Sequence, residues 1–258
     1  GQEWAYFLES ARQKGLKTIF FTDEDMPTTH VCDGLINDHP DAPDFKMTYL
    51  QTRMSSKREH RAVVHLNKIR MLLGIRHFMI DVVSHTTPDG QAPIFINFGG
   101  FDQHDALAKL AKPISVLSKD YPLTIVGANA ALLNLRKCAK GQHLVYNALP
   151  RETFIQNLAS SQFSITAAGN LLFERVHYNV PGVSLAQSEH QDTLGRCFAS
   201  LGLTAHFGKV TKLDAEHFLH QVRNLLDDSK AVAKQRLACQ HYDMQQGMSQ
   251  IVDLVKTI

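Results

Sequence analysis

Two apolar runs that each end in glycine are the feature that most constrains how this chain folds. The run Ile94–Phe98 is followed by Gly99-Gly100-Phe101-Asp102, and a later run ends in Ala167-Ala168-Gly169-Asn170 ahead of Phe173-Glu174. Each run predicts a buried strand that ends in a tight turn and continues into a helix. Two such turns on one parallel sheet direct backbone N–H groups toward a shared site, and this arrangement favours a ligand with a diphosphate.

The glycines have a physical role in such a turn. A tight turn needs a residue that can take positive φ, and a missing Cβ lets a phosphate approach the backbone. Neither turn matches G-x-G-x-x-G or the Walker loop. Glu174 follows Gly169 by about one helical turn, where its carboxylate is placed to accept both hydroxyls of a ribose. The alternative is that Glu174 only favours the positive end of its own helix.

Composition limits the classes of partner. The 258 residues exceed the ~100–200 residues of one typical domain, so one large or two smaller domains are expected. The 27 Lys and Arg residues nearly balance the 25 Asp and Glu residues, and no basic block indicates nucleic acid. The apolar runs are far shorter than the ~20 residues that span a bilayer. With four scattered cysteines and no secretory signal, the sequence predicts a soluble, cytoplasmic protein.

Fourteen histidines raise the question of a metal site. The sequence has neither His-Glu-x-x-His nor Cys-x-x-Cys, and His30-x-Cys32 has no partner pair at zinc-finger spacing. We therefore expect no metal and no other cofactor.

From Pro93 onward, strands and helices alternate with short loops, which is typical of a parallel sheet covered on both faces. A helix is expected over Asp214–Leu226, with Thr211-x-x-Asp214 as its capping box. A last helix is expected over 229–256, with a break near Gly247. The expected strands are 94–98, 123–127, 143–146, 163–167, 182–186 and 204–208.

The first part of the chain shows a shorter α/β pattern. Turn-forming residues at 86–90 place a domain boundary between about 75 and 92. We therefore divide the chain into residues 1–80 and residues 81–258. The elements expected before the boundary are a helix over Gln2–Lys14, strands over 17–21 and 34–36, a candidate helix over Glu59–Leu73 and a candidate strand over Phe78–Val83.

Residues 93–227 resemble the C-terminal nucleotide-binding domain of GT-B enzymes, and within that group the UDP-sugar hydrolases of pseudaminic acid biosynthesis. Phe98–Asp102 is similar to their Phe-Gly-Gly-Ser-Asp. Ala167–Asn170 with Phe173-Glu174 is similar to their small-small-Gly-Ser turn and Trp-Glu helix. Asn179-Val180-Pro181 stands where they have Gly-Val-Pro. The resemblance implies a GT-B-like α/β fold, with a complete C-terminal Rossmann-like domain and the remainder of an N-terminal one.

The resemblance also implies a ligand, a UDP-linked sugar. It places uracil near the start of the Phe154 helix, the ribose on Glu174 and the diphosphate on Gly169 and Asn170. Gln191 would lie near the sugar or a phosphate. Together with Gly99 and Gly100 from the first turn, these are the candidate nucleotide- and sugar-binding residues.

The sequence departs from the hydrolases at the catalytic histidine. In that family a glycine-rich loop near the start of the N-terminal domain carries the histidine that activates water, so the resemblance implies that this chain is N-terminally incomplete. His190 replaces an Asn of the sugar-side loop, and its unperturbed pKa of ~6.5 suits general acid–base catalysis. The alternative is a polar surface residue.

Three functions remain open at this stage. The first is hydrolysis of a UDP-linked amino sugar in bacterial surface-glycan (nonulosonic acid) biosynthesis, and the second is glycosyl transfer from a UDP-sugar to a hydroxyl acceptor. The third is a nucleotide-sugar-binding fragment without catalysis. No sequence feature selects a sugar or an oligomeric state.

Overall fold

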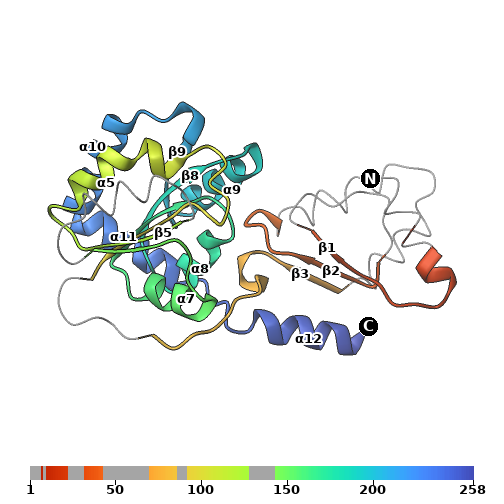
Figure 1. Cartoon of the computed structure of the whole chain (residues 1–258). Helices are drawn as coiled ribbons and strands as arrows, with labels where there is room; N and C mark the ends of the chain where they lie inside the picture. The colour runs from red at the N-terminus through yellow and green to blue at the C-terminus, as the bar shows by residue number, and fades with distance from the viewer. Residues whose placement is uncertain (1–6, 8–9, 23–31, 43–69, 86–91, 128–142) are drawn as a thin grey trace. The chain divides into compact units, whose positions relative to one another are not determined.

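The computed structural model describes residues 7, 10–22, 32–42, 70–85, 92–127 and 143–258. The chain divides into two compact units, one formed by residues 1–80 with 243–258 and the other by residues 81–242. Each unit contains a parallel β-sheet with helical segments packed against it (Figure 1). In the described part of the chain, no helix is both long and apolar enough to cross a bilayer.

The larger sheet lies in the second unit and has six parallel strands in the order β6-β5-β4-β7-β8-β9. They confirm the six strands that the sequence predicts, with bounds that differ by one residue at most. The strands are β4 (Ile94–Asn97), β5 (Leu123–Val126), β6 (Leu144–Tyr146), β7 (Phe163–Ala167), β8 (Gly182–Ala186) and β9 (Ala205–Lys209).

The strand order reverses between β4 and β7. The chain adds β5 and β6 on one side of β4, and then returns to add β7, β8 and β9 on the other side. Asn97 pairs with Thr166, so the carboxyl ends of β4 and β7 lie side by side. In open α/β sheets the crevice outside the strand ends at such a reversal is the usual ligand site.

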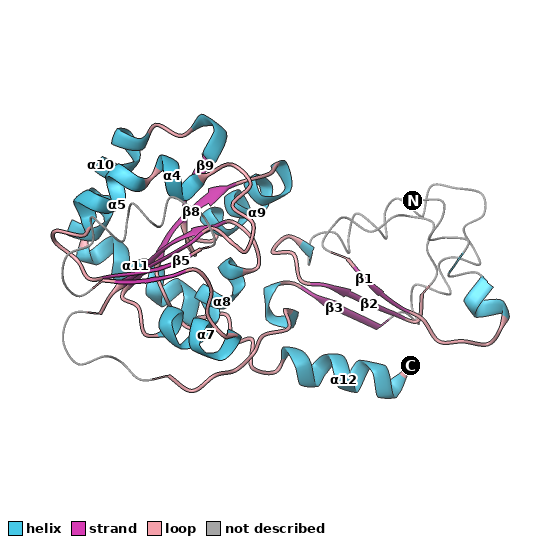
Figure 2. Ribbon diagram, in the orientation of Figure 1, coloured by secondary structure: helices cyan, strands magenta, loops and turns pink. Residues whose placement is uncertain are grey.

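Helices cover both faces of this sheet because side chains alternate along each strand (Figure 2). Ile94 and Ile96 point to one face and Phe95 to the other. The helices on the first face are α4 (Ala106–Lys109), α5 (Ala111–Leu117) and α10 (Ala215–Asp227). Those against Phe95 are α7 (Arg151–Ala159) and α8 (Leu171–His177).

Helix α8 is largely buried, although it carries two neighbouring charged residues that are both buried. Arg175 is 1% exposed and donates through Nη1 to Thr166 Oγ1 (3.3 Å), Val183 O (3.2 Å) and Thr204 Oγ1 (3.3 Å). Burial lowers the pKa of Arg175 to about 10. These bonds tie α8 to the sheet, so they restrict the direction in which the adjacent Glu174 points.

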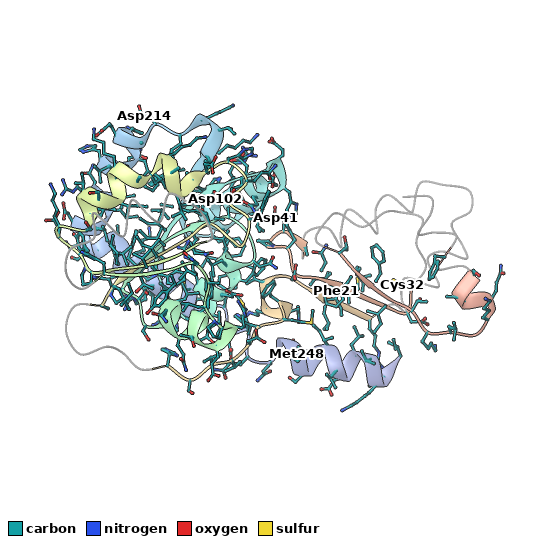
Figure 3. The ribbon with its side chains drawn as sticks, viewed as in Figure 1. Phe21, Cys32, Asp41, Asp102, Asp214 and Met248 are labelled. Carbon is teal, nitrogen blue, oxygen red and sulfur yellow. The ribbon has the colours of Figure 1, made fainter. Side chains whose placement is uncertain are left out.

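The C-terminal third of the chain confirms one detail of the sequence analysis and corrects another. The capping box at Thr211 is wrong, because Asp214 itself caps α10 and accepts from Glu216 N (3.0 Å) and His217 N (3.1 Å); Figure 3 labels Asp214. The break near Gly247 is confirmed. The remaining helical segments of this part are α9 (Glu189–Ser200), η2 (Val210–Lys212), α11 (Ser229–Gln240) and α12 (Gly247–Thr257).

The first unit holds a three-stranded parallel sheet in the order β1-β2-β3. Ile251 and Leu254 of α12 pack on Ile36, so residues 243–258 join this unit rather than the second domain expected from the sequence. Residues 10–13 are helical, within the helix expected over 2–14. The elements of the sheet and its neighbour are β1 (Ile19–Phe21), β2 (Gly34–Asn37), β3 (Arg70–Leu73) and η1 (Ile75–His77).

Two expected elements are wrong. Arg70–Leu73 form β3, not the end of a helix, and residues 59–69 of that expected helix lie outside the described residues. No strand forms over residues 78–83. Tyr178 explains part of this, because its Oη accepts from Val83 N (2.9 Å) and donates to Asp81 O (2.8 Å). The Tyr178 side chain thus pairs with backbone groups of Asp81 and Val83 that would otherwise bond to a neighbouring strand.

Candidate functional site

A cavity of about 630 Å³ opens at the carboxyl ends of β4, β5 and β7, where the strand order reverses. Its volume is in the range of small-molecule sites. All the described residues that line it belong to the second unit. The predicted site residues among them are Gly99, Gly100, Phe154, Gly169, Asn170, Glu174 and Gln191.

The first glycine turn is held open by Asn97. Gly99 has φ of +87°, which is strained for any residue with a Cβ. Asn97 Oδ1 accepts from Gly99 N (2.9 Å), and Asn97 Nδ2 donates to Val126 O (2.9 Å). One side chain therefore fixes the turn after β4 to the end of β5.

The helix after the first turn does not present its amides to the cavity. Asp102, labelled in Figure 3, accepts from Ala106 N (2.8 Å) and from Leu107 N (2.9 Å). Helix α4 begins only at Ala106, so residues 98–105 form a loop. The expectation that this strand runs straight into a helix with free amides is wrong, because the Asp102 carboxylate occupies them.

The second glycine turn is short and uncapped. Helix α8 begins at Leu171, and the Asn170 side chain makes no capping bond. Within the described residues, no acceptor pairs with the N–H groups of Gly169, Asn170 and Leu171. These groups are the unsatisfied donors that any helix start leaves, and they lie at the wall of the cavity.

Two glutamines that follow β8 form hydrogen bonds between the loop after β4 and the start of α9. Gln187 Nε2 donates to Phe98 O (2.6 Å), and Gln187 Oε1 accepts from His104 N (3.3 Å). Gln187 N donates to Gln191 Oε1 (2.9 Å). A Cβ on Gly169 would lie in ordinary van der Waals contact with Gln191 Nε2, at 3.5 Å, so the second glycine turn and the Gln191 side chain are direct neighbours.

Glu174 is the buried carboxylate of the cavity, with 6% of its side chain exposed. Its Oε1 accepts from Arg151 Nη2, and Arg151 Nε donates to Asp81 Oδ2 (2.9 Å). Burial raises the pKa of Glu174, and the hydrogen bond and charge of Arg151 oppose that rise. Although the carboxylate is buried, it lines the cavity and can be reached by a ligand there.

Apolar side chains form another part of the wall. The Phe154 ring stands edge-to-face against Phe95, with centroids 5.2 Å apart and planes at 88°. Leu149 and Val126 lie beside it in the lining. Flat, partly apolar rings such as nucleobases suit such a surface.

His190 is not among the described residues that line the cavity. It is exposed on the first turn of α9, whereas the next residue, Gln191, reaches the lining. Its catalytic role stays a prediction.

Three lining residues that the sequence analysis did not single out are Asn97, Gln187 and Arg151. Asn97 and Gln187 carry a local signal, because each is a buried polar residue at the end of an apolar strand. Arg151 carries none, because its partners Asp81 and Glu174 are distant in the sequence.

No protein family and no curated protein matches the sequence. Solved structures do match. MnaA of S. aureus in a co-structure with UDP has a TM-score of 0.63 at 14% identity, over 96% of this chain and 71% of that one. MurG of Acinetobacter baumannii has a TM-score of 0.62 at 12% identity, over 97% and 69%. The glycosyltransferase VinC in complex with dTDP has 0.57 at 11% identity, over 98% and 75%.

At these identities the similarity shows the fold. The structural neighbours are GT-B glycosyltransferases and UDP-sugar epimerases, and the GT-B-like α/β fold expected from the sequence is confirmed.

Proposed function

We propose that the cavity binds a UDP-sugar and that the protein breaks the bond between the anomeric carbon of the sugar and the β-phosphate oxygen. The observation that carries this proposal is the convergence, in one cavity, of the unpaired amides of the second glycine turn and the buried carboxylate of Glu174. Backbone N–H groups donate hydrogen bonds to phosphate oxygens, and an ionised carboxylate accepts hydrogen bonds from hydroxyl groups.

The proposed ligand lies along the cavity with its chemistry matched to the walls. The diphosphate accepts from the N–H groups of Gly169, Asn170 and Leu171, the ribose hydroxyls donate to Glu174, and uracil packs near Phe154. The sugar extends toward Gln191 and the loop after β4. Two of the fold's neighbours support a nucleoside diphosphate, because their structures hold UDP and dTDP.

Two acceptors fit the same donor site. In hydrolysis, the oxygen of water bonds to the anomeric carbon, its proton passes to a base, and UDP leaves with the electron pair of the broken bond. In glycosyl transfer, an acceptor hydroxyl takes the place of water. In both cases amide donors stabilise the charge that develops on the leaving diphosphate.

Hydrolysis of a UDP-linked amino sugar for nonulosonic acid biosynthesis is supported by the motifs Phe98–Asp102 and Ala167–Asn170, which resemble those of the UDP-sugar hydrolases. Glycosyl transfer is the second candidate, and the glycosyltransferases among the fold's neighbours favour it. Binding without turnover is the third.

Calorimetry and product release test these functions in order. We expect UDP to bind more tightly than UMP, and UMP more tightly than uridine, because each phosphate adds amide contacts. UDP release from a UDP-diacetamido sugar without an acceptor selects hydrolysis, and release that requires an acceptor selects transfer. Binding without release selects the third function, and the absence of UDP binding contradicts the proposal.

A further inference from the structure

The Glu174 carboxylate belongs to a small charged cluster with one cation and two anions. Arg151 Nη2 donates to Glu174 Oε1, and Arg151 Nε donates to Asp81 Oδ2 at 2.9 Å. The members differ in exposure, because the side chains of Arg151 and Asp81 are 51% and 64% exposed while that of Glu174 is 6% exposed. Burial thus acts mainly on Glu174.

Within the described cluster, Arg151 is the group that favours the charged form of Glu174 against the effect of burial. The titratable groups that face Glu174 are Arg151 on α7, Asp81 in the segment ahead of β4 and Tyr178 at the end of α8. Of these described groups, Arg151 is the one that carries positive charge. A buried carboxyl group without a cationic partner takes up a proton, because burial penalises the charged form.

Protonation would change what the carboxyl group can bind. An ionised carboxylate only accepts hydrogen bonds, and its bonds are about twice as strong as those between neutral groups. A protonated carboxyl turns one acceptor site into a donor. Arg151 uses one acceptor site of Glu174 Oε1, and no other described donor reaches this carboxylate. The remaining acceptor sites are therefore available to hydroxyl groups in the cavity.

We propose that Arg151 is a positioning residue that holds Glu174 ionised and directed into the cavity, and that it thereby makes the site selective for nucleotides with vicinal sugar hydroxyls. This inference rests on the proposed function for its ligand. Arg151 acts through Glu174 and, being at the start of α7, links the base-binding wall to the ribose-binding carboxylate. Deoxynucleotides lose the contact that Arg151 supports.

A cycle of ligands and variants tests the selectivity. UDP and 2′,3′-dideoxy-UDP are titrated by calorimetry into the wild type and into Arg151→Gln. We expect Arg151→Gln to weaken UDP binding about tenfold and dideoxy-UDP binding far less. The reason is that only UDP has the ribose hydroxyls that donate to the ionised carboxylate of Glu174, so only UDP has this bond to lose. Arg151→Lys keeps the positive charge but has fewer hydrogen-bond donors, so its UDP affinity should lie between that of the wild type and that of Arg151→Gln.

A matched control is Arg223→Gln, which removes an exposed Arg whose Nη2 contacts Asp120 Oδ2 at 2.6 Å, a pair outside the cavity lining. It should bind both ligands as the wild type does. If Arg151→Gln weakens UDP and dideoxy-UDP by the same factor, or neither, the inference is overturned.

A second readout needs no ligand. Carbon-13 NMR follows the protonation of the Glu174 carboxyl as the pH is raised from below the ordinary pKa of a glutamate. Arg151→Gln should move this titration to higher pH, since it removes the influence that lowers the pKa, and an unchanged titration overturns the inference. A wild-type protein that binds no UDP, with the titration moved as expected, contradicts the proposed function and leaves the action of Arg151 on Glu174 standing.

Discussion

The two glycine turns of the second unit look alike in sequence, but they use their backbone amides differently. After β4, the turn at Gly99 is followed by a loop, and Asp102 takes the first amides of the next helix. After β7, α8 begins two residues past Gly169, and no described side chain takes the corresponding amides. The helix start after the first turn is capped by Asp102, whereas the helix start after the second turn keeps unpaired amides at the wall of the cavity.

This difference teaches that a strand–glycine–helix pattern does not by itself make an anion site. What decides is whether a nearby side chain caps the helix. An aspartate in the loop accepts hydrogen bonds from two backbone N–H groups and places a negative charge beside them. A helix start capped in this way stabilises the fold and no longer attracts an external anion. We therefore propose that the second turn binds the phosphates, while Asp102 stabilises the loop after the first turn.

The largest expected effect separates the two turns in binding. Gly169→Val adds a branched side chain to the cavity wall between Gln191 and the unpaired amides, so we expect UDP affinity to fall by at least about 100-fold in calorimetry. Gly100→Val is the matched variant, because no atom lies within 4 Å of a Cβ there. It should lower affinity much less. Equal losses in both variants would break the comparison.

The next effect separates the turns in stability. Asp102→Ala leaves the amides of Ala106 and Leu107 without an acceptor, and we expect the free energy of unfolding to fall by about 1–2 kcal/mol in urea titrations. Asn170→Ala removes no capping bond, so its unfolding free energy should stay within about 0.5 kcal/mol of the wild type. A larger loss at Asn170 than at Asp102 would reverse our assignment.

Backbone strain gives a smaller effect at the first turn. Gly99 has φ of +87°, and a Cβ there would have no atom within 4 Å, so Gly99→Ala should cost about 1 kcal/mol from strain alone. Gly100→Ala, one residue later, is not in the left-handed region and should leave the unfolding midpoint unchanged. The prediction fails if the two alanine variants unfold at the same urea concentration.

The smallest effect concerns the helix that carries Gln191. The hydrogen bond between His206 Nε2 and Asp192 Oδ1 (3.1 Å) holds the pKa of Asp192 below its ordinary value of 3.8. Stability from this pair is present above that ordinary value and is lost as pH falls through the lowered pKa, because the unfolded chain then binds more protons. Asp192→Asn should flatten the acid limb of a stability–pH curve, and an unaltered limb would contradict it.

The strands of the second unit could be predicted because each is a short apolar run bounded by turn residues. The lining residues Gly99, Gly100, Gly169 and Glu174 could be predicted because glycine turns and a carboxylate one helical turn later are local patterns. Arg151 could not, because its role comes from ion pairs with residues far away in the sequence.

A distant contact also explains the strand that does not form over residues 78–83. Residues 78–83 have strand-like composition, but Tyr178 takes their backbone bonds from a distance. The fate of the Ala106 and Leu107 amides depended on where the Asp102 side chain points, and periodicity does not report this. Local sequence thus predicts the elements of this fold, whereas the direction of individual side chains, near or far in the sequence, decides which backbone amides stay unpaired.

Amide NMR during a UDP titration tests the central claim most directly, since it follows each N–H group by itself. We predict large shifts for Gly169, Asn170 and Leu171, while Ala106 and Leu107 stay nearly unchanged because Asp102 already holds them. The opposite pattern, or shifts confined to residues outside the cavity, would contradict the claim that the second glycine turn binds the diphosphate.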